Sequence, residues 1–222
     1  MATSSEAVSV GVGEVTLAGD LVLPGDARGV VAFAHGSGSS RHSPRNRAVA
    51  EVLQEAGLGT LLMDLLTRDE ERVDMVTAEL RFDIRLLGGR MTAAVDWLHE
   101  RPDTGGLPVG LFGASTGAAA ALVAAAERPE RVRAVVSRGG RPDLAGSALA
   151  GVRAPVLLVV GGQDREVLRL NEEAARQLMA LCTIRVIPGA THLFEEPGTL
   201  EQAAEAARDW FLRMAAGDGT EA

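Results

Sequence analysis

Apolar runs of five to seven residues alternate along this chain with longer segments whose apolar residues recur at helical spacing. Continuous apolar runs are typical of strands that helices cover on both faces. The first two segments instead alternate apolar residues with small or polar ones, and they predict an antiparallel hairpin around Gly13-Glu14. The eight expected strands are 8–12, 15–23, 29–34, 60–66, 107–112, 132–137, 155–160 and 183–187.

Helices are expected between the strands. Gly57 provides a stop signal for the first of them. The expected helices are 44–56, 81–100, 118–126, 167–181 and 200–215. The charged segment 67–77 is interpreted as a loop with some helix, and 139–151 as a loop with one short helix.

Strands that alternate with helices predict an α/β fold, here a three-layer sandwich with a mostly parallel sheet of about eight strands. The connection between residues 137 and 155 is too short for a large lid domain, so an open, shallow active site is expected. The length of 222 residues favours one domain, 1–222, with flexible ends at 1–7 and 217–222.

The net charge of −8, without a basic cluster, argues against nucleic acid or an anionic membrane as a partner. Cys182 is the one cysteine, so a disulfide within the chain is excluded, and we interpret it as structural. The sequence shows no signal peptide and no apolar stretch of membrane-spanning length. A cytoplasmic monomer or homodimer that acts on a small molecule is the resulting expectation.

Gly113-Ala114-Ser115-Thr116-Gly117 lies between an expected strand and an Ala-rich expected helix. This context predicts a tight turn that holds Ser115 at a helix N-terminus, and glycines are needed where a side chain would meet the neighbouring strand and helix. The motif alone is weak evidence, because a serine between glycines is most often an ordinary turn residue.

Two later segments strengthen this interpretation. Asp164, in Gly161-Gly162-Gln163-Asp164, and His192, in Gly189-Ala190-Thr191-His192, each follow an expected strand. Ligands bind beyond the carboxyl ends of strands in open parallel sheets, so the two side chains and Ser115 are expected to converge there. Ser115 is then the nucleophile, His192 the base, and Asp164 the group that orients His192.

His35-Gly36-Ser37-Gly38 follows another expected strand. The backbone N–H groups of Ser37 and Thr116 are predicted to form an oxyanion hole. A merely flexible loop is the alternative. His35 is expected to orient this loop, or to contact substrate, rather than to act as a second base.

On these four motifs the chain resembles an α/β-hydrolase of the dienelactone hydrolase-like family, over nearly its whole length. The resemblance implies hydrolysis of esters or lactones without a cofactor. Enzymes of that family have cysteine as the nucleophile, whereas this chain has Ser115. The serine favours a general carboxylesterase over an enzyme specific for dienelactones.

Several arginines follow expected strands on the same side of the sheet. Arg138 and Arg141 are candidate contacts for an anionic substrate, and Arg41, His42 and Arg45 raise the same question. Alternatively, Arg141 pairs with Asp143 and braces its loop. The carboxylates from Asp64 to Glu71 are interpreted as a solvated charged loop, because no His or Cys spacing supports a metal site.

The sequence therefore predicts a serine carboxylesterase for small esters or lactones. A thioesterase or acyltransferase would use the same three residues, and a non-catalytic binding protein with a retained site is the alternative from another class. A dehalogenase or epoxide hydrolase is disfavoured, since those enzymes carry a carboxylate at the position of Ser115.

Overall fold

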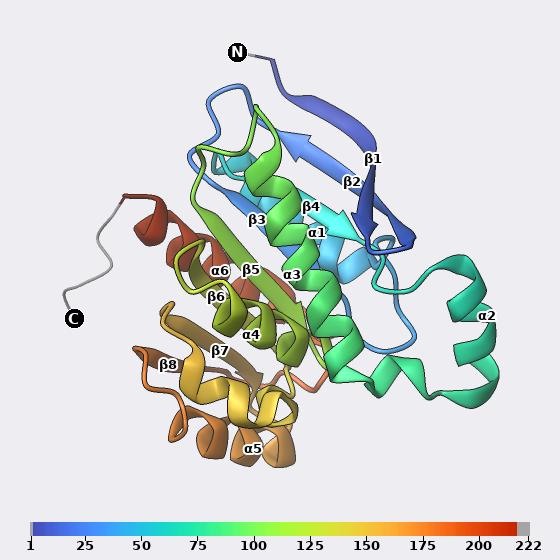
Figure 1. Cartoon of the computed structure of the whole chain (residues 1–222). Coiled ribbons are helices and arrows are strands. Elements are labelled where there is room, and N and C mark those ends of the chain that lie inside the picture. Colours follow the sequence, from blue (N-terminus) through green and yellow to red (C-terminus); the bar gives the residue numbers. More distant parts are fainter. Residues whose placement is uncertain (1, 217–222) are drawn as a thin grey trace.

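The computed structural model describes residues 2–216, in which eight strands form one sheet (Figure 1). The spatial order is β1-β2-β4-β3-β5-β6-β7-β8. The last six strands are parallel to one another, and the β1–β2 hairpin adds an antiparallel edge, as predicted. The strands are β1 (Ser4–Val12), β2 (Val15–Leu23), β3 (Val30–Ala34), β4 (Gly59–Met63), β5 (Val109–Ala114), β6 (Val132–Arg138), β7 (Val156–Gly161) and β8 (Cys182–Ile187).

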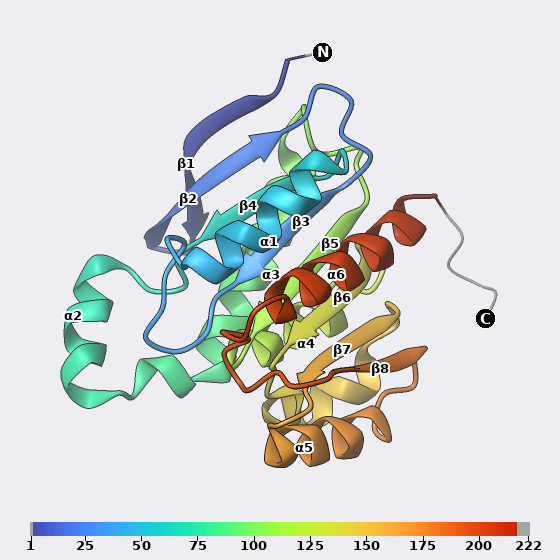
Figure 2. The ribbon, with the colours of Figure 1, turned by 180° about the vertical axis from the view of Figure 1, so that it is seen from behind.

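Helices cover both faces of the sheet and produce the expected three layers. On one face lie α3 (Ile84–Glu100), α4 (Gly117–Glu127) and α5 (Arg165–Ala175). On the other lie α1 (Pro44–Glu55) and α6 (Thr199–Ala216), as Figure 2 shows from behind. Each face has its own apolar core. Along β6, Val135 packs into the α3–α4 side, whereas Val136 packs into the α1–α6 side.

The segment 67–77 is a complete helix, α2 (Arg68–Thr77), and not a loop with some helix. Thr67 accepts a hydrogen bond from the Glu70 N–H, and the Glu70 side chain accepts one from the Thr67 N–H, which is a capping box. A short 3₁₀ turn, η1 (Leu80–Phe82), links α2 to α3. Asp74 is the one buried residue of α2, so the helix lacks the apolar stripe on which the sequence-based assignment depends.

Several other boundaries differ from the prediction. Strand β4 ends at Met63 and not at 66, β5 lies two residues later than expected, and α3 begins at Ile84 and not at 81. Strand β1 begins at Ser4, so residues 4–7 pair with β2, although they were expected to be flexible. Helix α5 ends at Ala175, six residues before the expected end. The N–H groups of Gln177 and Leu178 both donate to the Ala174 carbonyl in the turn that follows. Cys182 therefore opens β8. The connection 142–151 is a run of 3₁₀ turns, η2 (Pro142–Gly151), and the predicted flexible end 217–222 lies outside the described residues.

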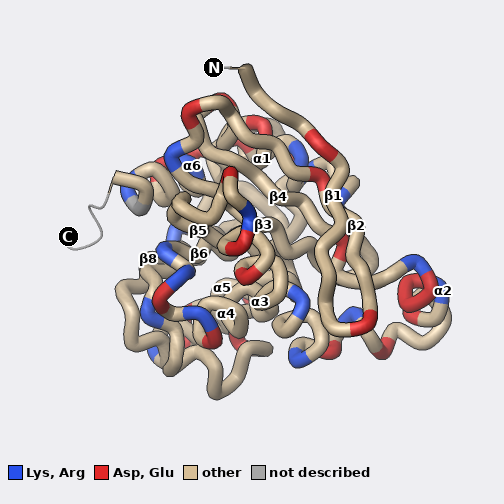
Figure 3. Tube along the Cα trace, turned by 45° about the horizontal axis from the view of Figure 1, so that its top comes forward, with Lys and Arg blue, Asp and Glu red and all other residues tan. Residues whose placement is uncertain are grey.

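Acidic and basic residues lie around the outside of the sheet, and α2 carries both signs (Figure 3). Within residues 2–216, no helix combines the length and apolar character needed to cross a bilayer.

Candidate active site

The turn between β5 and α4 holds Ser115 in the left-handed region, at φ +51°. Such a φ costs a non-glycine residue about 1 kcal/mol or more, so the surrounding structure must enforce it. A Cβ on Gly113 would lie 2.4 Å from the Ala118 Cα, and one on Gly117 would lie 2.2 Å from the Ala34 carbonyl oxygen. Only glycine fits at either position, which confirms the reason predicted for both.

The loop after β3 lies directly against this turn. A Cβ on Gly36 would stand 3.0 Å from the Ser115 Cβ. Within residues 2–216, the backbone N–H groups of Ser37 and Thr116 donate no hydrogen bond. Two adjacent free donors beside a serine can bind the oxygen of a substrate carbonyl as it becomes negatively charged.

His35 anchors that loop. Its Nδ1 donates to the Gly36 carbonyl at 2.9 Å, and its Nε2 accepts from the Leu65 N–H at 3.0 Å. Burial lowers the pKa of His35, which keeps the ring neutral and preserves this pair of hydrogen bonds. Both ring nitrogens are therefore engaged within the chain, and these two hydrogen bonds hold the loop against the backbone that follows β4.

His192 and Asp164 meet beyond the ends of β7 and β8. The His192 Nδ1 lies 2.8 Å from the Asp164 Oδ2. Backbone contacts bring the two loops together, because the Gln163 N–H donates to the Ala190 carbonyl at 2.9 Å. The His192 side chain is 40% exposed, whereas that of Asp164 is 16% exposed. A shielded carboxylate thus fixes the tautomer of a ring whose other nitrogen remains accessible.

The end of β6 connects Ser115 to His192. The Ser115 N–H donates to the Arg138 carbonyl at 3.3 Å. A Cβ on the next residue, Gly139, would lie 3.0 Å from the His192 carbonyl oxygen and 3.7 Å from its Nδ1. The structure therefore brings the three predicted catalytic residues to one edge of the sheet. A serine, a histidine held by a carboxylate and two free N–H groups together can perform acyl transfer.

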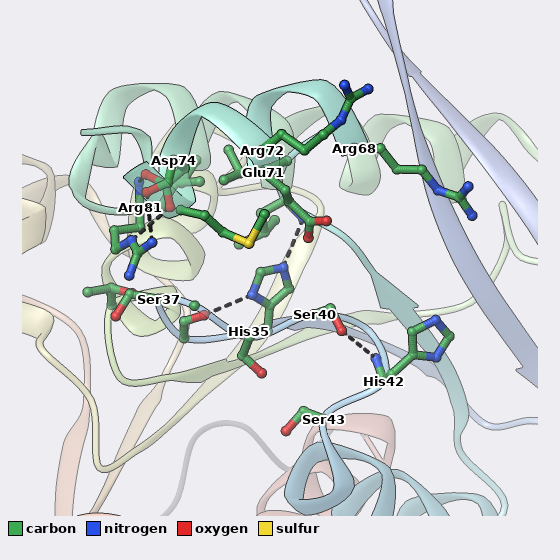
Figure 4. A pocket seen from close by; sticks show the side chains of 18 of the residues that line it. His35, Ser37, Ser40, His42, Ser43, Arg68, Glu71, Arg72, Asp74 and Arg81 are labelled. Carbon is green, nitrogen blue, oxygen red and sulfur yellow. Dashed lines mark hydrogen bonds and ion pairs between the residues drawn. The ribbon is translucent and has the colours of Figure 1, made fainter. Parts of the chain in front are cut away.

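A cleft of about 710 Å³ opens beside the loop that follows β3. The cleft is lined by Ser37 and Thr116 and, on a second wall, by Glu71, Met75 and Arg81 from α2 and η1. Figure 4 shows Glu71 and Arg81 above His35 and Ser37. The lining of this cleft does not include Ser115 or His192, so the expectation of an open, shallow active site stays a prediction. The wall comes from the segment before α3, whereas the prediction considered only the connection between β6 and β7.

Ion pairs hold the wall in place. Arg81 Nε donates to the Asp74 carboxylate at 2.7 Å, and Arg90 on α3 makes two hydrogen bonds to Glu70 at 2.6 and 2.8 Å. Arg90 also donates to the Leu65 carbonyl. The carboxylates interpreted as a solvated loop are thus largely paired with arginines, including Asp64 with Arg41.

We expect Glu70→Gln to lower the free energy of unfolding at pH 7 by ~2 kcal/mol, since it leaves the buried Arg90 charge without its carboxylate. The side-chain hydrogen bond from Arg90 is the largest cause that lowers the pKa of Glu70 to about 2, from 4.5. A carboxyl with a depressed folded-state pKa stabilises the protein fully above its unfolded pKa, and that stabilisation disappears as the pH falls through the folded value.

Urea unfolding of both proteins at several pH values checks this. The difference between wild type and Glu70→Gln should be constant above pH 4.5 and should shrink between pH 4.5 and 2. A difference that does not change over this range would contradict the proposed contribution of the pair.

The four arginines expected near the site differ in whether a carboxylate neutralises them. Arg41 is held by Asp64 and lies 3.6 Å from Asp20, and it does not line the cleft. Arg141 makes two hydrogen bonds to Asp143 at 2.9 and 2.8 Å, which is the bracing alternative. Arg45 meets an exposed carboxylate at 3.3 Å. Arg138 is 7% exposed and forms no ion pair with any described carboxylate.

The sequence analysis missed several residues around the site. Glu71 and Arg81 line the cleft from a segment without an apolar pattern, and Asn46 and Phe194 both contact Arg138. Phe194 has φ +56°, and its place two residues after His192 was the one available signal. Burial raises the pKa of the Cys182 thiol to about 11, so its reactive thiolate is scarce at neutral pH.

The chain is similar to known proteins over nearly its whole length. The profile of the dienelactone hydrolase family matches residues 17–216. The crystal structure of a dienelactone hydrolase from Anabaena variabilis is 62% identical, with a TM-score of 0.93 over 95% of this chain and 98% of that one. The esterase Est1E from Butyrivibrio proteoclasticus shares the fold, with a TM-score of 0.79 at 19% identity over 96% of this chain and 100% of that one.

Proteins from two strains of Mycobacterium tuberculosis, each named "Putative phosphoribosyl transferase", are 59% identical over 214 residues. The match covers 96% of this chain but 47% of each relative. The chain thus spans about half the length of these curated relatives, whose name describes proteins about twice as long.

Proposed function

This chain belongs to the dienelactone hydrolase family, and on that premise we propose that it is a serine hydrolase that cleaves small carboxylic esters or lactones. The observation that carries the proposal is the position of the His192–Asp164 hydrogen bond beside a strained serine that has two free N–H groups next to it. Family membership supports hydrolase activity on esters, and the residues support the serine mechanism.

In the proposed mechanism, the Ser115 Oγ attacks the carbonyl carbon while its proton passes to Nε2 of His192. The carbonyl oxygen becomes negatively charged and accepts hydrogen bonds from the N–H groups of Ser37 and Thr116. The N-terminus of α4 adds favourable potential at the same point. Asp164 stabilises the imidazolium through Nδ1.

The carbonyl then re-forms, the bond to the alkoxide breaks, and His192 gives its proton to the departing alcohol. This leaves an acyl group on Ser115. Water attacks that ester while His192 takes its proton, and the second tetrahedral intermediate releases the acid and restores the Ser115 hydroxyl. These residues supply every proton transfer, so the proposal requires no cofactor.

A thioesterase or acyltransferase would use the same residues, and only the leaving group or the acceptor would differ. A binding protein with an idle site is less well supported, because storing strain at Ser115 and leaving two donors unpaired both cost stability. The longer relatives are named as phosphoribosyl transferases, but the match covers only 47% of their length, so that name does not decide which reaction this chain performs.

The test is to treat the folded protein with a fluorophosphonate and to measure hydrolysis of 4-nitrophenyl esters from acetate to decanoate. We expect one covalent adduct, which peptide mass spectrometry locates on Ser115, and turnover that is fastest on the shorter chains. A protein that is never labelled and turns over no ester would favour the binding-protein alternative. Labelling without turnover of oxygen esters would favour the thioesterase.

A further inference from the structure

Arg138 carries a buried positive charge that no described carboxylate neutralises. It is the last residue of β6, it is 7% exposed, and it forms no ion pair with a described Asp or Glu. Its Nε is buried without a hydrogen-bond partner, and its Nη2 lies 3.3 Å from the Asn46 Oδ1. Burying an unpaired guanidinium is strongly unfavourable, so an anionic partner for Arg138 from outside the chain would relieve that cost.

The surroundings of Arg138 add further positive potential. Asn46 lies in the first turn of α1, which contains no acidic residue. The Arg45 N–H, in the same turn, has no acceptor among the described residues. Burial, with the Arg45 charge as a second cause, lowers the pKa of Arg138 to about 10, so the group remains charged at neutral pH.

The remaining side of Arg138 is apolar. Its guanidinium carbon lies 5.6 Å from the centroid of the Phe194 ring. Glu195 follows Phe194 in the chain, and its carboxylate lies 3.3 Å from the Arg45 guanidinium. The side chains of Arg45 and Glu195 are 36% and 64% exposed. A surface pair of this kind contributes little, so an incoming anion can replace Glu195 as the partner of Arg45.

This cluster adjoins the proposed catalytic residues. The carbonyl of Arg138 accepts from the Ser115 N–H, and Phe194 is two residues after His192. The side chain of Arg138 points to the α1–α6 face of the sheet, as its contacts with Asn46 and Phe194 require. The cleft lined by α2 does not include Arg138, so the cluster is distinct from that cleft.

We propose that Arg138, Arg45 and the N-terminus of α1 form an oxyanion subsite that binds an anionic group on the substrate. Guanidinium and helix N–H donors match the oxygens of phosphate and carboxylate. Two arginines and a helix N-terminus exceed the charge of one carboxylate, so the subsite should prefer a phosphate monoester dianion. This inference rests on the proposed hydrolase function, because it names the class of ester that the enzyme takes.

The kinetic test uses three 4-nitrophenyl esters with acyl chains of similar length that end in a phosphate monoester, a carboxylate or a methyl ester. For wild type we expect kcat/KM to fall in that order. Arg138→Gln should lower the ratio of kcat/KM for each anionic ester to that for the neutral one by at least about tenfold. Arg138→Lys should lower this ratio less than Arg138→Gln does, since lysine keeps the charge but not the planar donor pair.

Two further variants control this experiment. Arg45→Gln lies at the half-exposed rim, should fold as the wild type does, and should lower the same ratio more modestly. Arg153→Gln is the matched control, because Arg153 is 71% exposed and precedes β7 at the opposite end of the sheet. It should leave the ratio unchanged.

A binding measurement separates this inference from the proposed function. Inorganic phosphate should raise the Tm of Ser115→Ala more than that of the Ser115→Ala, Arg138→Gln double variant. With glutarate, the difference between the two Tm shifts should have the same sign but be smaller. Comparing the two proteins removes the general effect of salts on stability. If no ester is hydrolysed and this difference persists, the subsite stands and the esterase mechanism fails.

The opposite outcome overturns the inference alone. If the neutral ester is hydrolysed as fast as the anionic ones, and Arg138→Gln slows all three equally, Arg138 only positions the loop that carries His192. Equal Tm shifts in the two binding variants would likewise show that no anion binds at Arg138.

Discussion

Replacing Ser115 with Ala is expected to lower kcat for 4-nitrophenyl acetate by about 10⁴- to 10⁶-fold, the range typical for loss of a catalytic nucleophile. The reason is that no acyl-enzyme can form, and His192 and the oxyanion donors can then assist only direct attack by water. The fluorophosphonate adduct should disappear as well. Stopped-flow measurement of the 4-nitrophenolate burst, with active-site titration, checks both results.

The fold should tolerate the change, because alanine retains the Cβ that contacts Gly36. A second variant, Ser115→Gly, makes the control sharper. Glycine adopts φ +51° without strain, so this variant should be equally inactive while its free energy of unfolding rises by roughly 1 kcal/mol. Activity that survives both replacements would mean that another group is the nucleophile.

Asp164→Asn is expected to lower kcat by about 10⁴-fold with little change in stability. An amide that donates to Nδ1 of His192 would hold the proton on Nε2, where the ring can no longer accept one from Ser115. The carboxylate also stabilises the imidazolium that forms during the reaction. Asn still caps α5, where Asp164 accepts from the Val167 N–H at 3.4 Å, so the helix should be preserved.

The matched control is Glu166→Gln, which makes the same carboxylate-to-amide change two residues further along, on the exposed first turn of α5. Steady-state kinetics and thermal unfolding should be measured for both variants. If Asp164→Asn retains kcat within tenfold of wild type, the 2.8 Å contact with His192 is structural, and the tautomer is set in another way.

Most of the sheet could be predicted because its strands are buried on both faces and therefore appear as continuous apolar runs. Every residue of β3, β4, β5 and β7 is buried. Helix α2 was not predicted as a complete helix, and the reason is physical. It is held by Thr67, Glu70 and ion pairs to Arg81 and Arg90, and tertiary ion pairs have no periodicity to detect. The capping box at Thr67 was the overlooked signal.

The candidate site shows the same division. Ser115, Asp164 and His192 could be proposed from the sequence because each follows a strand, and strand ends meet at one edge. The four arginines could not be told apart in this way. Asp64 and Asp143 neutralise Arg41 and Arg141, but only the folded chain reveals that Arg138 faces Asn46 and Phe194 instead of an acid.

The position of His192 after β8, the last strand of the sheet, has a consequence for how the protein is made. A ribosome releases the Ser115 turn well before it adds the histidine. The nascent chain can therefore pair β3 with β5 and form the turn while the serine is still an ordinary, unreactive alcohol. On the proposed mechanism, hydrolytic activity should begin only when β8 joins the sheet and His192 meets Asp164, because an incomplete chain lacks the base that activates Ser115.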